Sequence, residues 1–299
     1  MTTPLNPVLV TGLEEPEGPV FGSDGTLYVV EMGAGRACVA TIDGARGTVA
    51  HGEHHGRPNG MTIDGDGNLW VAEARRGVVL CMNPDGEVLK TVTGPDGQRF
   101  LWPNDLRFGA DGMLYLTDSG ILDTDFIVGI AIRPDWAQAR YDGAVYQVDP
   151  VDGTIVRTID RGIRFTNGIA LGPDNALFVN ETIGGAVFRY DLDSTAPARE
   201  LFGNVNQNDD RQGWRGPDGM AFGEDGRLYC TVYGQGDVTV LDASGDVAER
   251  IPTNGALPTN IAFHPDGSGR AVVTEVAGGC VELVSTPTRG LPLHTPSFR

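Results

Sequence analysis

Six polar residues occupy one position of a repeated phrase, and side chains of these types could bind a metal ion. The phrase holds a Pro or Gly, a polar residue, a short apolar run, an Asp-Gly-type turn and a second apolar run. It recurs at intervals of roughly 40–60 residues, a period typical of propellers and other repeat arrays. The residues at the polar position are Glu17, Asn59, Asn104, Asn167, Asp218 and Asn260.

Four of these residues form a set of oxygen ligands. They supply two carboxylates and two amide carbonyls, with no Cys or His among them. Such oxygens are the ligands that Ca²⁺ prefers, while Mn²⁺, Mg²⁺ and Zn²⁺ can also use them. We therefore predict one divalent ion, with Ca²⁺ favoured. The predicted ligands are Glu17, Asn104, Asn167 and Asp218.

A structural explanation of the same residues is also open. Asn and Asp before Gly are ordinary turn formers, and polar residues can line a water-filled channel without binding anything. Turn preference does not explain a glutamate at position 17. The complete set of six therefore favours a site over this explanation.

The elements that must position these residues are β-strands. Each phrase contains two runs rich in strand formers, a third run follows in every copy, and a fourth follows in several. Four short strands repeated six times predict an all-β fold, a six-bladed β-propeller, with residues 1–299 as a single domain. Because the innermost strand of each blade runs beside the central channel, residues that open these strands converge. Residues just before them should surround the pocket, and these are Arg57, Trp102, Phe165, Trp214 and Arg215.

Two segments stand outside the repeat. The run PVLVTG at 7–12 is predicted to complete the last blade, since the last copy has only about three strands of its own. Residues 119–143 are long for a loop in a compact domain. They could cover the mouth of the propeller, form a contact in a homo-oligomer, or pack as a hairpin on their own blade.

Composition limits the partners and the location. The chain of 299 residues has a formal charge of −18, which disfavours nucleic acid and anionic lipid. No apolar run reaches the roughly 20 residues of a membrane span, and the N-terminal sequence does not resemble a secretory signal. We expect a cytoplasmic protein without a membrane partner, acting on a small molecule. The cysteines at 38, 81, 230 and 280 are predicted to be buried free thiols, and HGEHHG at 51–56 to be a solvated turn.

The ordered motifs identify a family resemblance. EGP at 17–19, PND at 103–105, NG at 167–168 and PDG at 217–219 together resemble the senescence marker protein/gluconolactonase family, which includes regucalcin and is related to diisopropylfluorophosphatase. The resemblance implies a catalytic divalent metal held by Glu17, Asn167 and Asp218. Asn104 resembles a fourth ligand, or a residue that holds substrate or water near the metal. Residues predicted to support these from behind are Asn59, Asp105, Asp118 and Asn260.

The resemblance implies hydrolysis of a lactone, a cyclic ester. Asp218 is the predicted general base, although it could instead act as a nucleophile or only as a ligand. Sugar lactonases of the family resemble one another in an Arg two residues before the third-blade Asn, where this chain has Trp102. That difference favours a more apolar substrate. The alternatives are an organophosphate or aryl-ester hydrolase on the same metal platform, and a non-catalytic metal-binding propeller.

Overall fold

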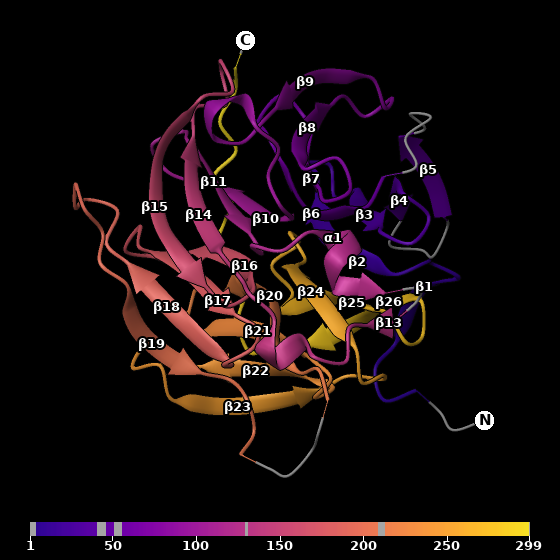
Figure 1. Cartoon of the computed structure of the whole chain (residues 1–299). Coiled ribbons are helices and arrows are strands. Elements are labelled where there is room, and N and C mark those ends of the chain that lie inside the picture. The colour runs from indigo at the N-terminus through magenta and orange to yellow at the C-terminus, as the bar shows by residue number, and fades with distance from the viewer. Residues whose placement is uncertain (1–3, 41–45, 51–55, 129–130, 209–212, 299) are drawn as a thin grey trace.

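The computed structural model describes residues 4–40, 46–50, 56–128, 131–208 and 213–298, with the backbone alone at 37–40 and 46–50. The described chain is an all-β propeller. Its strands form six four-stranded antiparallel sheets and one two-stranded sheet. The sheets are arranged around a central axis (Figure 1).

Each four-stranded sheet is built from the inside outward, and all but the last take their four strands from one repeat. The first, innermost strands are β2 (Pro16–Phe21), β6 (Pro58–Ile63), β10 (Pro103–Phe108), β16 (Thr166–Leu171), β20 (Gly216–Phe222) and β24 (Pro258–Phe263). The second are β3 (Leu27–Glu31), β7 (Leu69–Glu73), β11 (Leu114–Asp118), β17 (Leu177–Glu181), β21 (Leu228–Tyr233) and β25 (Arg270–Glu275). The third are β4 (Arg36–Ala40), β8 (Val78–Met82), β14 (Gly143–Val148), β18 (Ala186–Tyr190), β22 (Asp237–Leu241) and β26 (Cys280–Ser285). The outermost are β5 (Arg46–Ala50), β9 (Val88–Val92), β15 (Ile155–Ile163), β19 (Glu200–Asn204), β23 (Val247–Pro252) and β1 (Val8–Thr11).

The turn between the first two strands explains the Asp-Gly signal of the repeat. A backbone with positive φ is required there, which glycine adopts without steric cost. Gly25 and Gly67 have φ of 85°, and the corresponding Asn175 has φ of 59°. The Asp24 carboxylate accepts hydrogen bonds from the backbone and side chain of Thr26, which holds the turn.

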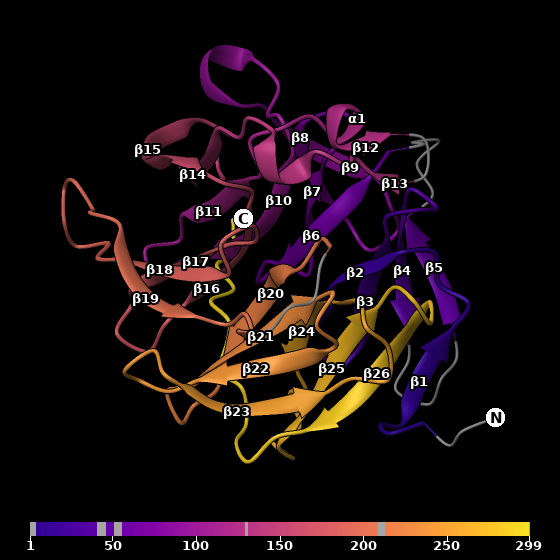
Figure 2. The ribbon, with the colours of Figure 1, turned by 60° about the horizontal axis from the view of Figure 1, so that its bottom comes forward.

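The N-terminal strand closes the ring, as predicted. β1 pairs with β26, so the sheet of the last repeat is completed from the start of the chain. Each innermost strand contacts the next along the chain, and β24 contacts β2. Figures 1 and 2 show β1 beside β26, with the N-terminus at the rim. The closed ring places the openings of all the innermost strands around one channel.

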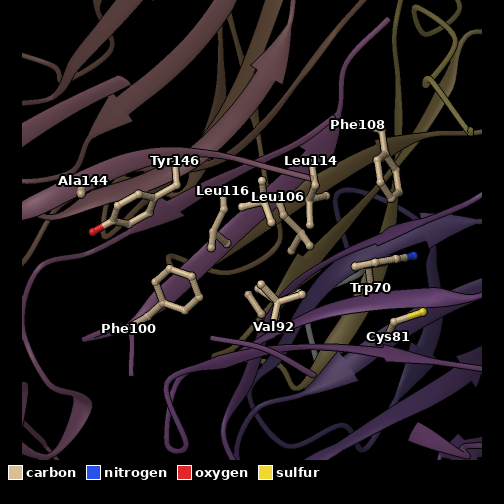
Figure 3. Close-up of a cluster of buried hydrophobic side chains, with 13 residues drawn as sticks. Trp70, Cys81, Val92, Phe100, Leu106, Phe108, Leu114, Leu116, Ala144 and Tyr146 are labelled. Atoms are coloured by element: carbon tan, nitrogen blue, oxygen red, sulfur yellow. The ribbon is translucent and has the colours of Figure 1, made fainter. Parts of the chain in front are cut away.

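Apolar side chains fill the spaces between neighbouring sheets. Figure 3 shows one such cluster, in which Trp70 and Cys81 from one sheet face Leu106, Leu116 and Tyr146 from the next. Cys81, Cys230 and Cys280 are buried free thiols, as predicted, while the side chain of Cys38 and residues 51–55 of the HGEHHG segment lie outside the described part. Among the described residues, no helix is long and apolar enough to cross a membrane.

The insertion at 119–143 forms small elements over one end of the ring. These are α1 (Asp123–Phe126), the hairpin of β12 (Ile127–Val128) and β13 (Ala131–Ile132), and a 3₁₀ turn at Trp136–Gln138. A further 3₁₀ turn, Pro95–Gly97, lies between β9 and β10. Phe126 packs against Phe165 and Trp214, which precede two other innermost strands. The insertion therefore covers the mouth of the channel and is not confined to its own blade.

The C-terminal tail crosses the other end of the ring. Leu291 N–H donates to the carbonyl of Phe222, and Gly65 N–H donates to the carbonyl of Pro296. Phe222 ends β20 and Gly65 follows β6, strands on opposite sides of the ring. Phe298 then packs against Trp70 and Phe108. In Figure 2 the C-terminus lies near the middle of the arrangement.

Candidate metal centre

Strand register decides which residues lie at the same level of the channel. In five of the sheets the last residue of the innermost strand pairs with the first residue of the second strand, as Phe21 does with Leu27 and Phe108 with Leu114. Phe263 pairs with Ala271 in the last sheet. Counting four residues back from each strand end gives Glu17, Asn59, Asn104, Asn167, Asp218 and Thr259.

Five of the six predicted positions are therefore equivalent, and Asn260 is not. It lies one residue beyond the level of the others, where Asp105 stands in β10, and Thr259 takes the predicted position. The last phrase reads PTN where the third reads PND, so aligning the two asparagines moves the register by one residue. In a strand, such a shift moves a side chain to the other face.

Two asparagines are oriented by their amide nitrogens. Asn104 Nδ2 donates to Ser119 Oγ at 3.0 Å, and Asn167 Nδ2 donates to Thr182 Oγ1 at 3.1 Å. Both hydroxyls in turn donate to backbone carbonyls of the next innermost strand. Because the nitrogens are held in this way, each amide has its carbonyl oxygen as the remaining polar atom, and that is the atom a hard metal ion needs.

Glu17 is buried, with 2% of its surface exposed, and is held from two sides. Its Oε2 accepts hydrogen bonds from the backbone N–H of Gly18 and from Asn260 Nδ2. Burial, then repulsion by Asp105, raises the pKa of Glu17 to about 7. The carboxylate lacks enough positive charge around it to remain ionised as readily as it would in water.

Asp218 is the more open of the two predicted acidic ligands, since its residue retains intermediate exposure. Its backbone carbonyl accepts a 2.5 Å hydrogen bond from Asn180 Nδ2. Burial of the carboxyl group and repulsion from Glu17 and Asp105 raise its pKa well above the usual value. A hydrogen bond from Asn167 opposes that rise, so Asp218 is in direct contact with a second predicted ligand.

Asp105, predicted to support the ligands from behind, is electrostatically coupled to two of them. Its Oδ1 accepts from Arg107 Nη1 at 3.0 Å, while its buried Oδ2 has no hydrogen-bond partner among the described residues. Asp105, Glu17 and Asp218 act on one another electrostatically, and Arg107 acts on Glu17. Three carboxylates thus face one guanidinium, which leaves about two negative charges for a divalent cation to balance.

The residues present therefore fit a hard divalent ion. The observations are the uncompensated carboxylates, an orphaned buried carboxylate oxygen, and two amides oriented by their nitrogens. Among described residues, no group of three His, Cys, Asp or Glu side chains is arranged to hold a metal by itself. A metal here would thus depend on the asparagine oxygens as well as on the acids.

Asn59 and Asp118 occupy different environments. Asn59 is buried at the level of the ligands, but its Nδ2 lies 3.8 Å from Met32 Sδ. Asp118 accepts backbone N–H groups of Leu101, Trp102 and Gly120, and burial raises its pKa. Glu73 and Glu275 bind backbone N–H groups in the same way in other sheets. Asp118 therefore has the contacts of a strand-end cap.

The predicted aromatic pocket residues lie together above this level. Trp102 and Phe165 are 5.5 Å apart between ring centroids, and Phe165 and Trp214 are 4.9 Å apart. Phe126 contacts all three. Phe165 has φ of 62°, a strained conformation for a bulky side chain that the surrounding packing must enforce. Phe126 was absent from the predicted set because it belongs to the insertion and not to the repeat.

The two predicted arginines have protein partners. Arg57 Nη2 donates to Glu15 Oε2 at 3.0 Å. Arg215 Nη2 donates to the Gln207 carbonyl at 3.2 Å. A substrate carboxylate would therefore have to compete with these contacts, most of all with the ion pair at Arg57.

The sequence and the fold correspond to a known family of proteins. Residues 15–277 match the family model described as the SMP-30/Gluconolactonase/LRE-like region, and the chain belongs to this family. The resemblance inferred from the four motifs is thereby confirmed.

Proteins similar to this chain are named for different functions. The chain is 27% identical over 289 residues to a gluconolactonase of Zymomonas mobilis, which covers 89% of this chain and 78% of that protein. It is 27% identical over 274 residues to diisopropyl-fluorophosphatase of Loligo vulgaris, covering 83% and 82%. Its fold is similar to a structure of regucalcin from Agrobacterium tumefaciens, described as a calcium-binding protein, with a TM-score of 0.73, 18% identity and coverage of 99% and 98%.

Proposed function

We propose that this protein is a divalent-metal-dependent hydrolase that opens lactones. The proposal rests on one observation: two carboxylates and two oriented amides lie at one level of the channel. They belong to Glu17, Asp218, Asn104 and Asn167. Family membership and the similarity to a gluconolactonase support the reaction class. The six four-stranded sheets support a single domain of six blades.

Glu17, Asn167, Asp218 and Asn104 are the proposed ligands of one ion, with Ca²⁺ favoured. The oxygen-only set and the similarity in fold to a calcium-binding regucalcin support this choice. Mn²⁺, Mg²⁺ and Zn²⁺ are the alternatives. When bound, the ion would supply Lewis acidity at the ester carbonyl. Asp105 and Arg107, which form an ion pair of 3.0 Å, would determine the net charge of the protein next to the ion.

Asp218 is the proposed general base. It is the ligand carboxylate with part of its surface open, so an attacking water could approach it and give up a proton to it. Asn104 would orient the substrate or that water, since Ser119 fixes its amide. Glu17, buried and held by Asn260, would contribute charge without moving.

The aromatic cover favours an apolar or aromatic substrate over a polyhydroxy one. Trp102, Phe165 and Trp214 supply an apolar surface beside the ligands, and Phe126 completes it. The Trp102 indole N–H is buried without a partner among the described residues, so it could donate to a substrate oxygen. The partner is thus a small molecule, and a cytoplasmic location remains our expectation.

A second activity is favoured by one comparison. The similarity to a diisopropyl-fluorophosphatase, together with the aromatic cover, supports an organophosphate or aryl-ester hydrolase on the same metal platform. In that reaction Asp218 could attack phosphorus itself in place of acting on water.

A substrate panel separates these activities. Acid release would be measured with γ- and δ-lactones, both sugar-derived and apolar, and beside them aryl esters and an organophosphate. The proposal predicts the highest kcat/KM for apolar lactones. Turnover of the phosphorus substrate alone would select the second activity, and no turnover despite a bound metal would leave a non-catalytic metal-binding propeller.

A further inference from the structure

A second compartment of the channel lies at the end opposite the candidate metal centre. It is a cavity of about 740 Å³ lined by the ends of the innermost strands, including Phe21, Phe108, Leu171 and Phe222. Cavities of this size with mostly apolar walls and a few polar groups are typical of small-molecule sites. None of the proposed metal ligands lines it.

The C-terminal tail closes this compartment from below. Residues 289–295 line the cavity, and the tail is held on both sides of the ring by the Leu291–Phe222 and Gly65–Pro296 hydrogen bonds, 2.8 Å each. Arg289 forms an ion pair of 2.6 Å with Glu224. The cavity is thus bounded by segments that are far apart in sequence.

Arg107 introduces a cation into the wall. It stands one residue before the end of β10, a level occupied in the other innermost strands by small or uncharged residues. Those residues are Val20, Thr62, Ala170, Ala221 and Ala262. Arg107 lies three residues, about 10 Å, along the strand from Asn104, so it separates the cavity from the metal centre.

Within the described part of the chain, one edge of the Arg107 guanidinium has hydrogen-bond partners and the other has none. Nη1 donates to Asp105 Oδ1 at 3.0 Å, to the Leu106 carbonyl at 2.8 Å and to the Met61 carbonyl at 3.2 Å. The hydrogen bonds that Arg107 donates to the described residues all come from Nη1. Nε and Nη2 form the fork that binds a carboxylate through two parallel hydrogen bonds. Arg107 itself lines the cavity.

The acidic residues of the wall are already satisfied. Asp64 accepts four hydrogen bonds, including one from Trp70 Nε1, and Asp266 pairs with Arg270. Glu224 pairs with Arg289, and Asp24 is held within its turn. Arg107 is therefore the buried cation of the wall with bonding capacity toward the cavity, whereas Arg289 is exposed and paired with Glu224. The buried Nε2 of His264 is a further polar atom of the wall without a partner among the described residues.

We infer that this compartment is a second binding site, for an organic carboxylate with an apolar body. The carboxylate would pair with the Nε and Nη2 edge of Arg107, and the body would lie among Phe21, Phe108 and Phe222. The inference goes beyond the proposed lactonase activity and does not require it.

Titration calorimetry with 4-phenylbutyrate tests the site, with the neutral 4-phenylbutanol as the matched ligand. Full-length protein would be used, both metal-loaded and chelated. Ala221→Leu fills the cavity without touching a proposed metal ligand, and Arg107→Met removes the cation. Because Arg107 also holds Asp105, Ala221→Leu is the decisive variant, and its turnover should match wild type.

We expect 4-phenylbutyrate to bind with or without metal, and the alcohol to bind at least about tenfold more weakly. Ala221→Leu should weaken the acid by about tenfold or more. Equal affinity for acid and alcohol would overturn the inference. So would wild-type affinity in Ala221→Leu, affinity that disappears on chelation, or the absence of binding at millimolar concentration.

Discussion

Asn260 Nδ2 donates to Glu17 Oε2 at 3.0 Å, which joins the last innermost strand to the first at the candidate metal centre. The two residues are 243 positions apart in the chain. The contact exists only because the ring is closed, so assembly of the centre and closure of the fold depend on the same structure.

Asn260→Ala should therefore weaken metal binding without removing a proposed ligand. Outer hydrogen bonds to metal ligands are typically worth about 10–100-fold in affinity, and we expect a loss of that size. The measurement is metal titration by calorimetry. Asn59→Ala is the matched control, because Asn59 lies at ligand level but contacts Met32. Equal effects of the two variants would contradict a specific role for Asn260.

Metal binding should weaken as the pH falls. The pKa of Glu17 is raised to about 7 in the metal-free protein, so below pH 7 a proton competes for the carboxylate. For one competing proton, affinity falls about tenfold per pH unit. The raised pKa of Glu17 also affects the free energy of unfolding of the metal-free protein. Its dependence on pH has the opposite sign to that caused by a salt-bridged acid, whose pKa is lowered. The folded metal-free state binds a proton that the unfolded state releases, so its stability falls as the pH rises from the ordinary value of 4.5 toward 7. Affinity that is constant between pH 8 and 5.5 would contradict this account.

Phe126→Ala should change substrate preference. Phe126 is 2% exposed and contacts Trp102, Phe165 and Trp214, so its loss opens the apolar cover. We expect kcat/KM for apolar lactones to fall by about tenfold or more, and that for sugar lactones to change less. Val128→Ala, in the same insertion but 61% exposed, is the control. A parallel loss on both substrate classes would indicate damage to the metal centre and not to the cover.

Closure of the ring should be measurable as stability. Val10 of β1 is 3% exposed in an apolar cluster with Leu13 and Val29, whereas Val8 of the same strand is 37% exposed. Val10→Asp buries an unpaired charge and should lower Tm by more than about 5 °C. Val8→Asp should lower it by less than about 2 °C. Similar melting curves for both variants would mean that β1 does not hold the ring closed.

The repeat allowed much of the fold to be predicted, because period and turn chemistry are local properties of the sequence. The pairing of β1 with β26 followed from counting strands. Asn260 was assigned to the wrong register because Thr259 stands in the place of an asparagine. The orphaned Oδ2 of Asp105, and the coupling of Asp105 to Glu17 and Asp218, depend on contacts between different strands, which no local pattern records. Phe126 was missed because it lies in the insertion.

Metal stripping and restoration is the decisive experiment on the proposed metal centre. Lactone turnover and bound metal would be measured on the same samples, first after chelation and then during stepwise return of Ca²⁺, for wild type and Glu17→Gln. Glu249→Gln, on the exposed strand β23, is the control for loss of a surface carboxylate. If the protein is a metal-dependent hydrolase, turnover of the wild type and of the control should disappear on chelation and return in full at one ion per chain. Glu17→Gln should bind weakly and turn over at least about 100-fold more slowly. Turnover that survives stripping, or that is unchanged in Glu17→Gln, would contradict the account.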